Sequence, residues 1–432
     1  MDTLSILMLC LVTLILLGVP IYMSLIASTV LSLFFTGSVP LSLIHNSLFD
    51  GLNSFPLLAI PCFVVAGTLM EQGGVTGQII EVVKLLVGRM HGGLGVTTIL
   101  ACTFFAAISG SGPGTVAAVG TLLIPSMLRN GYTPKYAAAV SSSGGTVGIL
   151  IPPSNPLIIY GIMGNISITG LFTAGFVPGF IIATALMITA WIVARKQGFS
   201  GDASEAPFDL MVLLRTCGRN IFALLTPFII LGSIYSGVCT PVEASVVAVV
   251  WALFVGFVVN RKLNGPRLYT SLLEGVMICG VVLLIVGAST LFGKILTFEQ
   301  APLRLANAFL GFSQSKTVIL LLILCLLLFL GMFLETLATL IILVPVLLPV
   351  VTHLGVDPIH FGIVLVVTNE IALLTPPLGV NLFVSSRIAN LPVETVAMGV
   401  IPYLIALMIC MLLITFVPAI STWLPHLLGY GM

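Results

Sequence analysis

SGSGPGT at residues 109–115 and IPPSN at residues 151–155 interrupt an otherwise apolar sequence. A similar pair recurs in the second half of the chain, with GMFLETLAT at residues 331–339 and TPPLG at residues 375–379. Proline and glycine in this density break a helix and leave backbone groups without partners. Broken apolar helices at corresponding places in two halves are typical of membrane proteins that build a binding site at mid-membrane.

The composition places the chain in a bilayer. Of its 432 residues, 59% are hydrophobic and only 7% are charged. Stretches such as 319–330 are apolar on every face, whereas a β-barrel strand would alternate, so we expect an all-α integral membrane protein. The net charge of +1 offers no basic surface for nucleic acid. The eight cysteines lack metal-ligand spacing and are interpreted as small buried side chains.

The sequence does not predict an enzyme. An intramembrane enzyme needs a nucleophile, a carboxylate pair or a metal cluster at membrane depth, and no two of the five histidines share ligand spacing. No phosphate-binding loop for ATP is present.

The basic residues predict the topology. No Lys or Arg precedes Lys84, so the first apolar segment has its N-terminus outside, and the basic clusters fit the cytoplasmic side. About ten full spans and two re-entrant hairpins follow, with both termini periplasmic. We expect two inverted repeats, at 1–195 and 215–432, joined by a cytoplasmic linker at 196–214. The predicted hairpins are 93–128 and 318–350, and the predicted broken helices are 136–162 and 361–384.

The hairpin tips carry the specific chemistry. Carbonyls freed at Pro152-Pro153 and Pro376-Pro377, with nearby Ser and Thr hydroxyls, are neutral hard oxygens that suit sodium. The half-helices that begin near Thr115 and Leu337 present positive dipole ends suited to a carboxylate. The alternative is a proline kink with glycines for close helix packing. Two matching copies favour the binding site.

Three charges near the second break need separate weighing because a charge inside a membrane is costly unless it is paired or solvated. Glu335 lies at the tip, and it fits an ion-site role as well as an ion pair. Glu370 is interpreted first as half of a structural ion pair, with Arg387 as a possible cation. Arg387 itself could receive a substrate carboxylate or end a cytoplasmic helix.

The motifs GILIPPS at 148–154 and LLTPPLGVN at 373–381 resemble those of TRAP transporters, the tripartite ATP-independent periplasmic carriers. The resemblance is to their large membrane subunit and covers essentially the whole chain. It implies an elevator mechanism, in which a transport domain moves against a scaffold, and two sodium sites with the substrate between them. The sodium ligands carried over by position are Ser109, Ser111, Gly112, Gly145, Gly148 and Pro152 for the first site, and Gly331, Thr336, Thr368, Thr375 and Leu378 for the second. The candidate substrate contacts are Thr115, Ser154, Asn155, Glu335, Asn381 and Arg387.

The resemblance also implies partners and a function. The partners are a small four-helix membrane subunit and a soluble periplasmic binding protein, both expected as separate chains. The expected function is sodium-driven uptake of an organic acid across the bacterial inner membrane, with no cofactor besides Na⁺. Sialic acid leads by overall resemblance, while a C4-dicarboxylate or a keto acid stays open. A self-sufficient sodium/carboxylate carrier on a related inverted-repeat fold is the alternative class.

Overall fold

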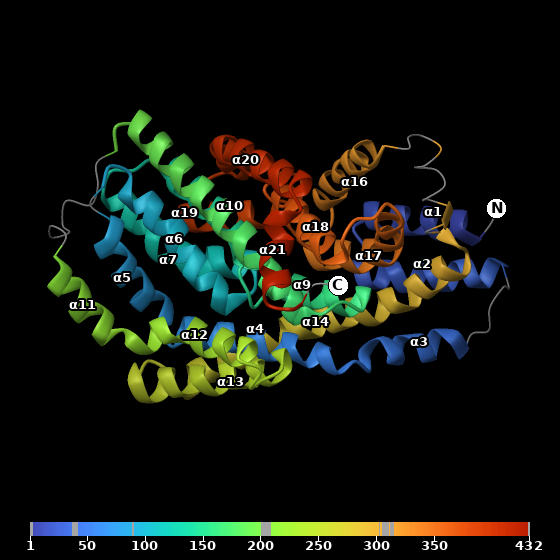
Figure 1. The fold of residues 1–432 in the computed structure, drawn as a ribbon, viewed down its shortest axis with the longest axis horizontal. Coiled ribbons are helices and arrows are strands. Elements are labelled where there is room, and N and C mark those ends of the chain that lie inside the picture. The colour runs from blue at the N-terminus through green and yellow to red at the C-terminus, as the bar shows by residue number, and fades with distance from the viewer. Residues whose placement is uncertain are drawn as a thin grey trace.

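The computed structural model describes residues 3–36, 42–88, 90–199, 209–301, 303–304, 311 and 315–430, and these residues form helices without strands (Figure 1). The first half contains α1 (Thr3–Leu16), α2 (Ile21–Thr36), α3 (Ser42–Leu52), η1 (Phe55–Leu58), α4 (Ala59–Gln72), α5 (Val75–Val87), α6 (Gly93–Ser109), α7 (Gly112–Arg129), α8 (Pro134–Gly145), η2 (Thr146–Ile149), α9 (Asn155–Gly164) and α10 (Ile168–Lys196). The second half contains α11 (Leu210–Arg219), α12 (Ile221–Tyr235), α13 (Pro241–Phe254), η3 (Val255–Val259), α14 (Gly265–Phe298), α16 (Lys316–Gly331), α17 (Thr336–His353), α18 (Pro358–Ala372), α19 (Val380–Ala389), α20 (Val393–Phe416) and α21 (Ala419–Leu427).

The helices have the length and composition of a multi-pass membrane protein. Six described helices are long and apolar enough to cross a bilayer, and a seventh crossing follows if α11 and α12, which are bent by 67°, count as one span. The ten spans expected from the sequence include the short helices α1 and α2 and take each broken helix as one crossing. Helix α17, which the sequence predicts as one arm of a hairpin, is by itself long and apolar enough to cross a bilayer.

Both proline pairs interrupt helices where the sequence predicts. Helix α8 continues through η2 and stops before Pro152-Pro153, and α9 begins at Asn155. Helix α18 ends before Pro376-Pro377, and α19 begins at Val380. Both proline–proline peptide bonds are cis. The first break is buried, whereas Pro376 and Pro377 are exposed.

The first predicted hairpin consists of α6 and α7, which pack side by side. Gly110 makes the turn with a φ of 60°, a value that glycine adopts without strain. Ser111 then caps α7, since its Oγ accepts a hydrogen bond from the Gly114 N–H at 3.4 Å. The second pair differs, because α16 packs mainly against α18 and makes little contact with α17.

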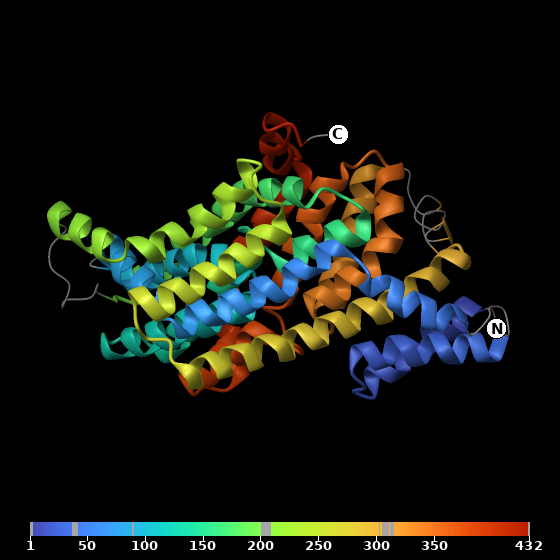
Figure 2. The same ribbon diagram turned by 90° about the horizontal axis from the view of Figure 1, so that it is seen from below.

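Two groups of helices position the site. The outer layer, defined as α3, α4, α13 and α14, runs along one side of the molecule, with α4 packed against both α13 and α14 (Figures 1 and 2). The Thr68 hydroxyl of α4 donates to the Ser271 carbonyl of α14 at 3.1 Å. The hairpin core, defined as α6–α9 and α16–α19, packs beside this layer, and α14 contacts α17.

Packing inside the hairpin core is reciprocal between the two halves. Helix α7 packs against α19, and α17 packs against α9. The second arm of each hairpin therefore contacts the second part of the other broken helix. This is the packing that two inverted repeats would give, although the repeat assignment itself stays a prediction. The predicted linker at 196–214 includes residues 200–208, which lie outside the described residues.

Candidate functional site

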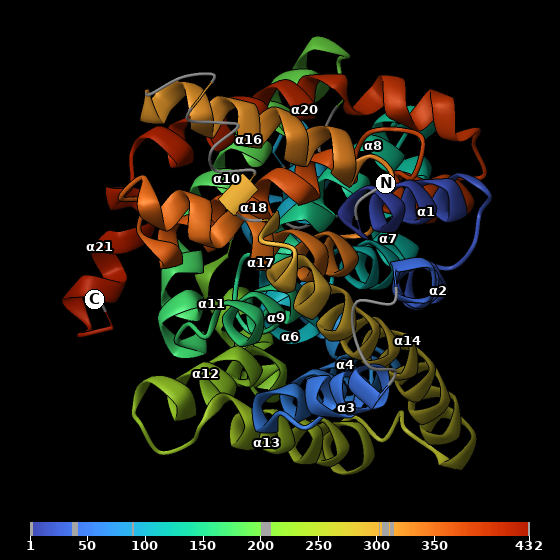
Figure 3. The ribbon, with the colours of Figure 1, turned by 90° about the vertical axis from the view of Figure 1, so that its right-hand side faces the viewer.

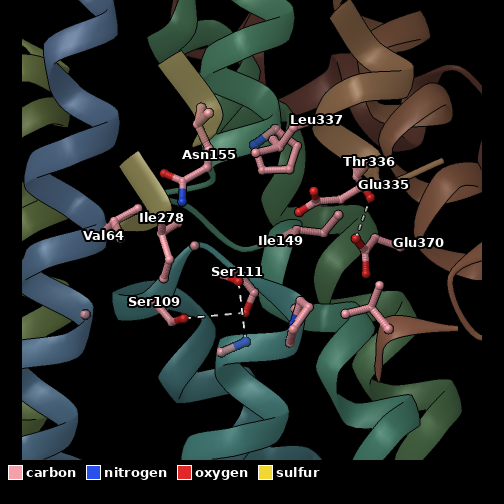
Figure 4. A pocket seen from close by; sticks show the side chains of 18 of the residues that line it. Val64, Ser109, Ser111, Ile149, Asn155, Ile278, Glu335, Thr336, Leu337 and Glu370 are labelled. Carbon is pink, nitrogen blue, oxygen red and sulfur yellow. Dashed lines mark hydrogen bonds between the residues drawn. The ribbon is translucent and has the colours of Figure 1, made fainter. Parts of the chain in front are cut away.

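A cavity of about 140 Å³ lies where the two hairpin tips and the two breaks face the outer layer (Figure 4). Most of the polar side chains in its lining come from the hairpin core. They are Ser109, Ser111, Asn155, Glu335, Thr336 and Glu370. The outer layer supplies Val64, Gly67, Thr68 and Glu71 from α4 and Ile278 and Val282 from α14. The cavity therefore lies on the boundary between the two groups of helices.

The first tip is held against the first break. The Thr115 hydroxyl donates to the Ser111 carbonyl at 2.8 Å, and the Ser109 hydroxyl donates to the same carbonyl at 3.4 Å. The Asn155 N–H donates to the Gly110 carbonyl at 3.4 Å. A Cβ added at Gly110 would lie 2.8 Å from the Pro153 carbonyl oxygen, so a side chain here would push the tip away from the break.

The second tip is held against the second break in a comparable way. The Leu378 N–H donates to the Met332 carbonyl at 3.0 Å. The Thr336 hydroxyl donates to Glu370 Oε1 at 2.9 Å, the contact drawn in Figure 4. A Cβ added at Gly331 would lie 2.7 Å from Asn369 Oδ1, so glycine allows this tip to approach α18.

Residues of the two halves meet beside the cavity. A Cβ placed at Gly112 would lie 3.0 Å from Glu370 Oε2, 3.2 Å from the Gly145 carbonyl oxygen and 3.4 Å from Asn381 Nδ2. Gly112 and Gly145 belong to the first half, whereas Glu370 and Asn381 belong to the second. The absence of a side chain at both glycines lets the first tip and the end of α8 approach α18 and α19 of the second half.

Several buried polar atoms at this convergence have no hydrogen-bond partner among the described residues. They are Asn155 Oδ1, Glu370 Oε2 and both amide atoms of Asn369 and of Asn381. Glu370 is only 2% exposed. A buried polar atom without a partner costs about 1–3 kcal/mol, so a cluster of them marks a place that a polar ligand or an ion can fill.

Four helices begin at this cavity. The first residues of α7 (Gly112), α9 (Asn155), α17 (Thr336) and α19 (Val380) all contribute to its lining. The first turn of a helix has free N–H groups and a partial positive charge, which attract anions. The cavity lining includes no Lys or Arg among the described residues. An anion in this cavity would therefore be held by helix ends rather than by basic side chains.

The structure brings most of the predicted site residues together. Ser109, Ser111, Gly112, Thr336, Asn155 and Glu335 line the cavity, and Gly145, Gly148, Gly331, Thr115 and Asn381 lie directly behind this lining. Ser154 is buried and caps α9 by accepting the Leu157 N–H. Pro152 and Leu378 lie in the two breaks, outside the lining. The roles of these residues stay predictions.

Three predicted residues are placed less favourably. Arg387 is exposed in the last turn of α19 and does not line the cavity. The Thr368 hydroxyl donates to the Val364 carbonyl of its own helix at 2.6 Å. Thr375 is half-buried beside the exposed proline pair and does not line the cavity.

The contribution of α4 to the cavity is not predicted from the sequence. Glu71 is not among the site residues predicted from the sequence, whereas the structure places it in the cavity lining, with Thr68 one turn earlier. A carboxylate inside an apolar segment was the available signal. The suggested ion pair of Glu370 is wrong for the part of the chain that is described, because its partner is the Thr336 hydroxyl and no cation pairs with it.

An all-helical multi-pass membrane chain with broken helices around a buried polar cavity belongs to the class of membrane transport proteins. Residues 8–420 match the family described as "Tripartite ATP-independent periplasmic transporter, DctM component", and the chain belongs to this family. It is therefore a TRAP transporter large permease and not an enzyme. The family implies a small membrane subunit, a periplasmic binding protein and the inner membrane.

Three relatives show how far the substrate varies. The chain is 40% identical to the isethionate TRAP transporter permease protein DctMQ of Oleidesulfovibrio alaskensis, over 93% of this chain and 63% of that relative, so it spans less than two thirds of that protein. It is 39% identical to the sialic acid TRAP transporter large permease protein SiaM of Vibrio cholerae serotype O1, over 96% of each chain. It is 38% identical to the C4-dicarboxylate TRAP transporter large permease protein DctM of Pseudomonas aeruginosa, over 88% of this chain and 89% of that one.

A solved structure shares the fold. The YdaH transporter of Alcanivorax borkumensis superposes with a TM-score of 0.65 over 89% of each chain, at 16% sequence identity. Its crystal structure is described as revealing an unusual topology.

Proposed function

We propose that this chain carries an organic acid across the inner membrane together with sodium, after a periplasmic binding protein has delivered the acid. The observation that carries the proposal is the convergence of four helix N-termini on one cavity without a basic side chain in its described lining. The helix ends favour an anion, and they offset the repulsion from Glu71, Glu335 and Glu370 in the same lining. The predicted periplasmic location of both termini is part of the same proposal.

Sodium coupling is supported by the oxygen atoms around the two breaks. The Ser109, Ser111 and Thr336 hydroxyls line the cavity beside backbone carbonyls of the tips and breaks. Each of these is a neutral hard oxygen donor. The hydrogen of the Thr336 hydroxyl is directed to Glu370, so its lone pairs remain for a cation.

Sialic acid is the substrate that we propose first. The relative named for sialic acid matches 96% of both chains. The cavity also offers the carboxylates of Glu71, Glu335 and Glu370 as hydrogen-bond acceptors. A monoanion with several hydroxyl donors complements this arrangement, and its one carboxylate meets less repulsion from the three acidic side chains than the two carboxylates of a C4-dicarboxylate would. The similarity to the DctM relative keeps the C4-dicarboxylate as the second candidate.

An elevator movement is the transport step that we propose. The cavity lies between the hairpin core and the outer layer, and α4 and α14 contribute mainly apolar side chains to it apart from Thr68 and Glu71. A largely apolar surface offers few hydrogen bonds that would have to break when the hairpin core slides along it. In this proposal the outer layer belongs to the static scaffold.

The test is uptake of labelled sialic acid into proteoliposomes that contain this chain and its small subunit. Uptake that requires both the binding protein and an inward sodium gradient is the expected result. Uptake that is indifferent to the binding protein would favour a self-sufficient carrier. Uptake of a C4-dicarboxylate but not of sialic acid would reject the proposed substrate and retain the mechanism.

A further inference from the structure

A second cavity, of about 480 Å³, lies between α6, α10, α12 and α21. Figure 3 shows α12 and α21 on the same flank of the molecule. The volume is in the range of small-molecule sites, about 300–1,000 Å³. Its lining shares no residue with the cavity at the hairpin tips.

The lining is almost entirely apolar. Phe104, Phe176 and Phe228 supply rings, and no charged side chain contributes. The two threonines are already satisfied, because Thr103 donates to the Ile99 carbonyl and Thr173 to the Thr169 carbonyl, each at 2.8 Å. An occupant must therefore be apolar over most of its length.

One polar atom in the lining stands apart. The hydroxyl of Tyr235 is buried beside Thr173 and makes no hydrogen bond of normal geometry with the described residues. Tyr235 is the last residue of α12, so the hydroxyl lies at the end of a membrane helix. Tyrosine in this position marks the level where lipid headgroups meet acyl chains. The cavity thus combines an apolar body with one polar atom at headgroup level.

The cavity is accessible from the hydrocarbon of the bilayer. Phe180 and Phe228 contribute to its lining, yet their side chains are 56% and 68% exposed. In a multi-pass membrane protein the apolar exposed surface faces lipid. The surrounding bilayer is therefore the nearest source of an occupant.

We propose that this cavity binds one acyl chain of a membrane phospholipid, with the Tyr235 hydroxyl donating to the ester carbonyl of that lipid. The apolar lining suits the acyl chain, the exposed rim gives this chain a way in from the bilayer, and the Tyr235 hydroxyl suits the ester carbonyl.

The location of the cavity also connects the lipid to transport, and this connection rests on the proposed function. Ile151, which directly precedes Pro152 of the first break, lines this cavity together with residues of α6, the helix that ends at the first tip. On the opposite side α12 packs against α13 of the outer layer. A bound chain therefore contacts both the hairpin core and a helix fixed to the outer layer. Its occupancy would set how easily the core moves.

Photolabelling tests the binding directly. The transporter with its small subunit is placed in nanodiscs that contain a phosphatidylethanolamine with a diazirine in one acyl chain. We expect labelled peptides from α6 and α12. Gly232 lies at the exposed rim of the cavity, and a Cβ there meets no atom within 4 Å, so the ring of Gly232→Phe should obstruct the cavity and lower this labelling. Gly218→Phe in α11 also enters open space and should leave the labelling unchanged.

A second variant separates the hydroxyl from the shape of the cavity. Tyr235→Phe keeps the ring and should fold normally, and we expect it to lower the labelling yield. Equal labelling of wild type, Gly232→Phe and Tyr235→Phe would overturn the proposal. Labelling that is absent from α6 and α12 in the two-subunit complex would also overturn it, because another apolar segment would then fill the cavity. The readout does not depend on uptake, so it stands if the proposed substrate fails.

Discussion

The hydrogen bond between the second hairpin tip and the second broken helix can be removed with little change in shape. The Thr336 hydroxyl donates to Glu370 Oε1 at 2.9 Å, and both residues are buried. Thr336→Val replaces the hydroxyl by a methyl group. The substitution deletes one proposed sodium ligand, and it leaves both carboxyl oxygens of Glu370 without a partner, because Oε2 already lacks one.

The size of the effect follows from the burial. Removing one partner of a buried polar group costs about 1–3 kcal/mol. Each 1.4 kcal/mol is a tenfold change in an equilibrium constant. If the sodium-bound state loses this amount, the sodium concentration that half-activates uptake should rise roughly 5–150-fold. We also expect lower thermal stability, because the deleted bond joins α17 to α18.

The assay is the sodium dependence of uptake in proteoliposomes at saturating binding protein. Thr336→Ser keeps a hydroxyl and should stay close to wild type. Thr339→Val is the matched control, since the Thr339 hydroxyl only donates to the Glu335 carbonyl within α17, at 3.1 Å. Combining Thr336→Val with Glu370→Gln should give less than the sum of the two effects, because the substitutions share one contact.

Two results would refute this reasoning. Thr336→Val with an unchanged half-activating sodium concentration would show that the Thr336 oxygen is no ligand. Strict additivity with Glu370→Gln would show that the hydrogen bond does not contribute in the protein.

Three further substitutions follow from the structure. Gly148→Ala should abolish uptake while the two-subunit complex still assembles, because its Cβ would lie 2.7 Å from Thr115 Oγ1 and would push the first break from the tip. Tyr160→Phe should destabilise the protein by about 1 kcal/mol, measured by thermal unfolding, because the buried hydroxyl donates to the Pro358 carbonyl at 2.6 Å and links the two halves. Arg387→Ala should leave the apparent affinity for the acid unchanged in uptake assays, since this side chain is exposed away from the cavity.

For each of the three substitutions, one outcome would contradict the expectation. Gly280→Ala introduces a methyl group into open space on α14 and should retain uptake, so equal activity of Gly148→Ala and Gly280→Ala would contradict the close fit. An unchanged melting temperature of Tyr160→Phe would mean that the hydroxyl bond adds nothing to stability. A large loss of affinity in Arg387→Ala would restore the sequence-based interpretation of Arg387 as a substrate contact.

Local chemistry made the breaks predictable. The proline pairs stop α8 and α18 because proline lacks an N–H, and Ser111 and Ser154 cap the helices that follow. Hydrophobicity likewise predicts an all-helical membrane protein, since backbone groups in a bilayer must be satisfied within helices. These features depend on residues near one another in the chain.

The remaining features depend on long-range packing. Glu71 reaches the cavity only because α4 of the outer layer packs against the hairpin core. The unpartnered atoms of Asn369 and Glu370 lie where Gly331, at the end of α16, and Gly112, at the start of α7, approach α18. Helix α16 likewise packs against α18, which is distant in the chain, and makes little contact with its neighbour α17. No short motif encodes these contacts.

A structure of the complex with sodium and sialic acid, determined in nanodiscs under conditions of saturated uptake, tests the central claim most directly. We expect the acid in the cavity between the hairpin tips, with its carboxylate at helix N-termini and sodium among the oxygens of the breaks. Acid bound elsewhere in the chain, with this cavity unoccupied, would contradict it.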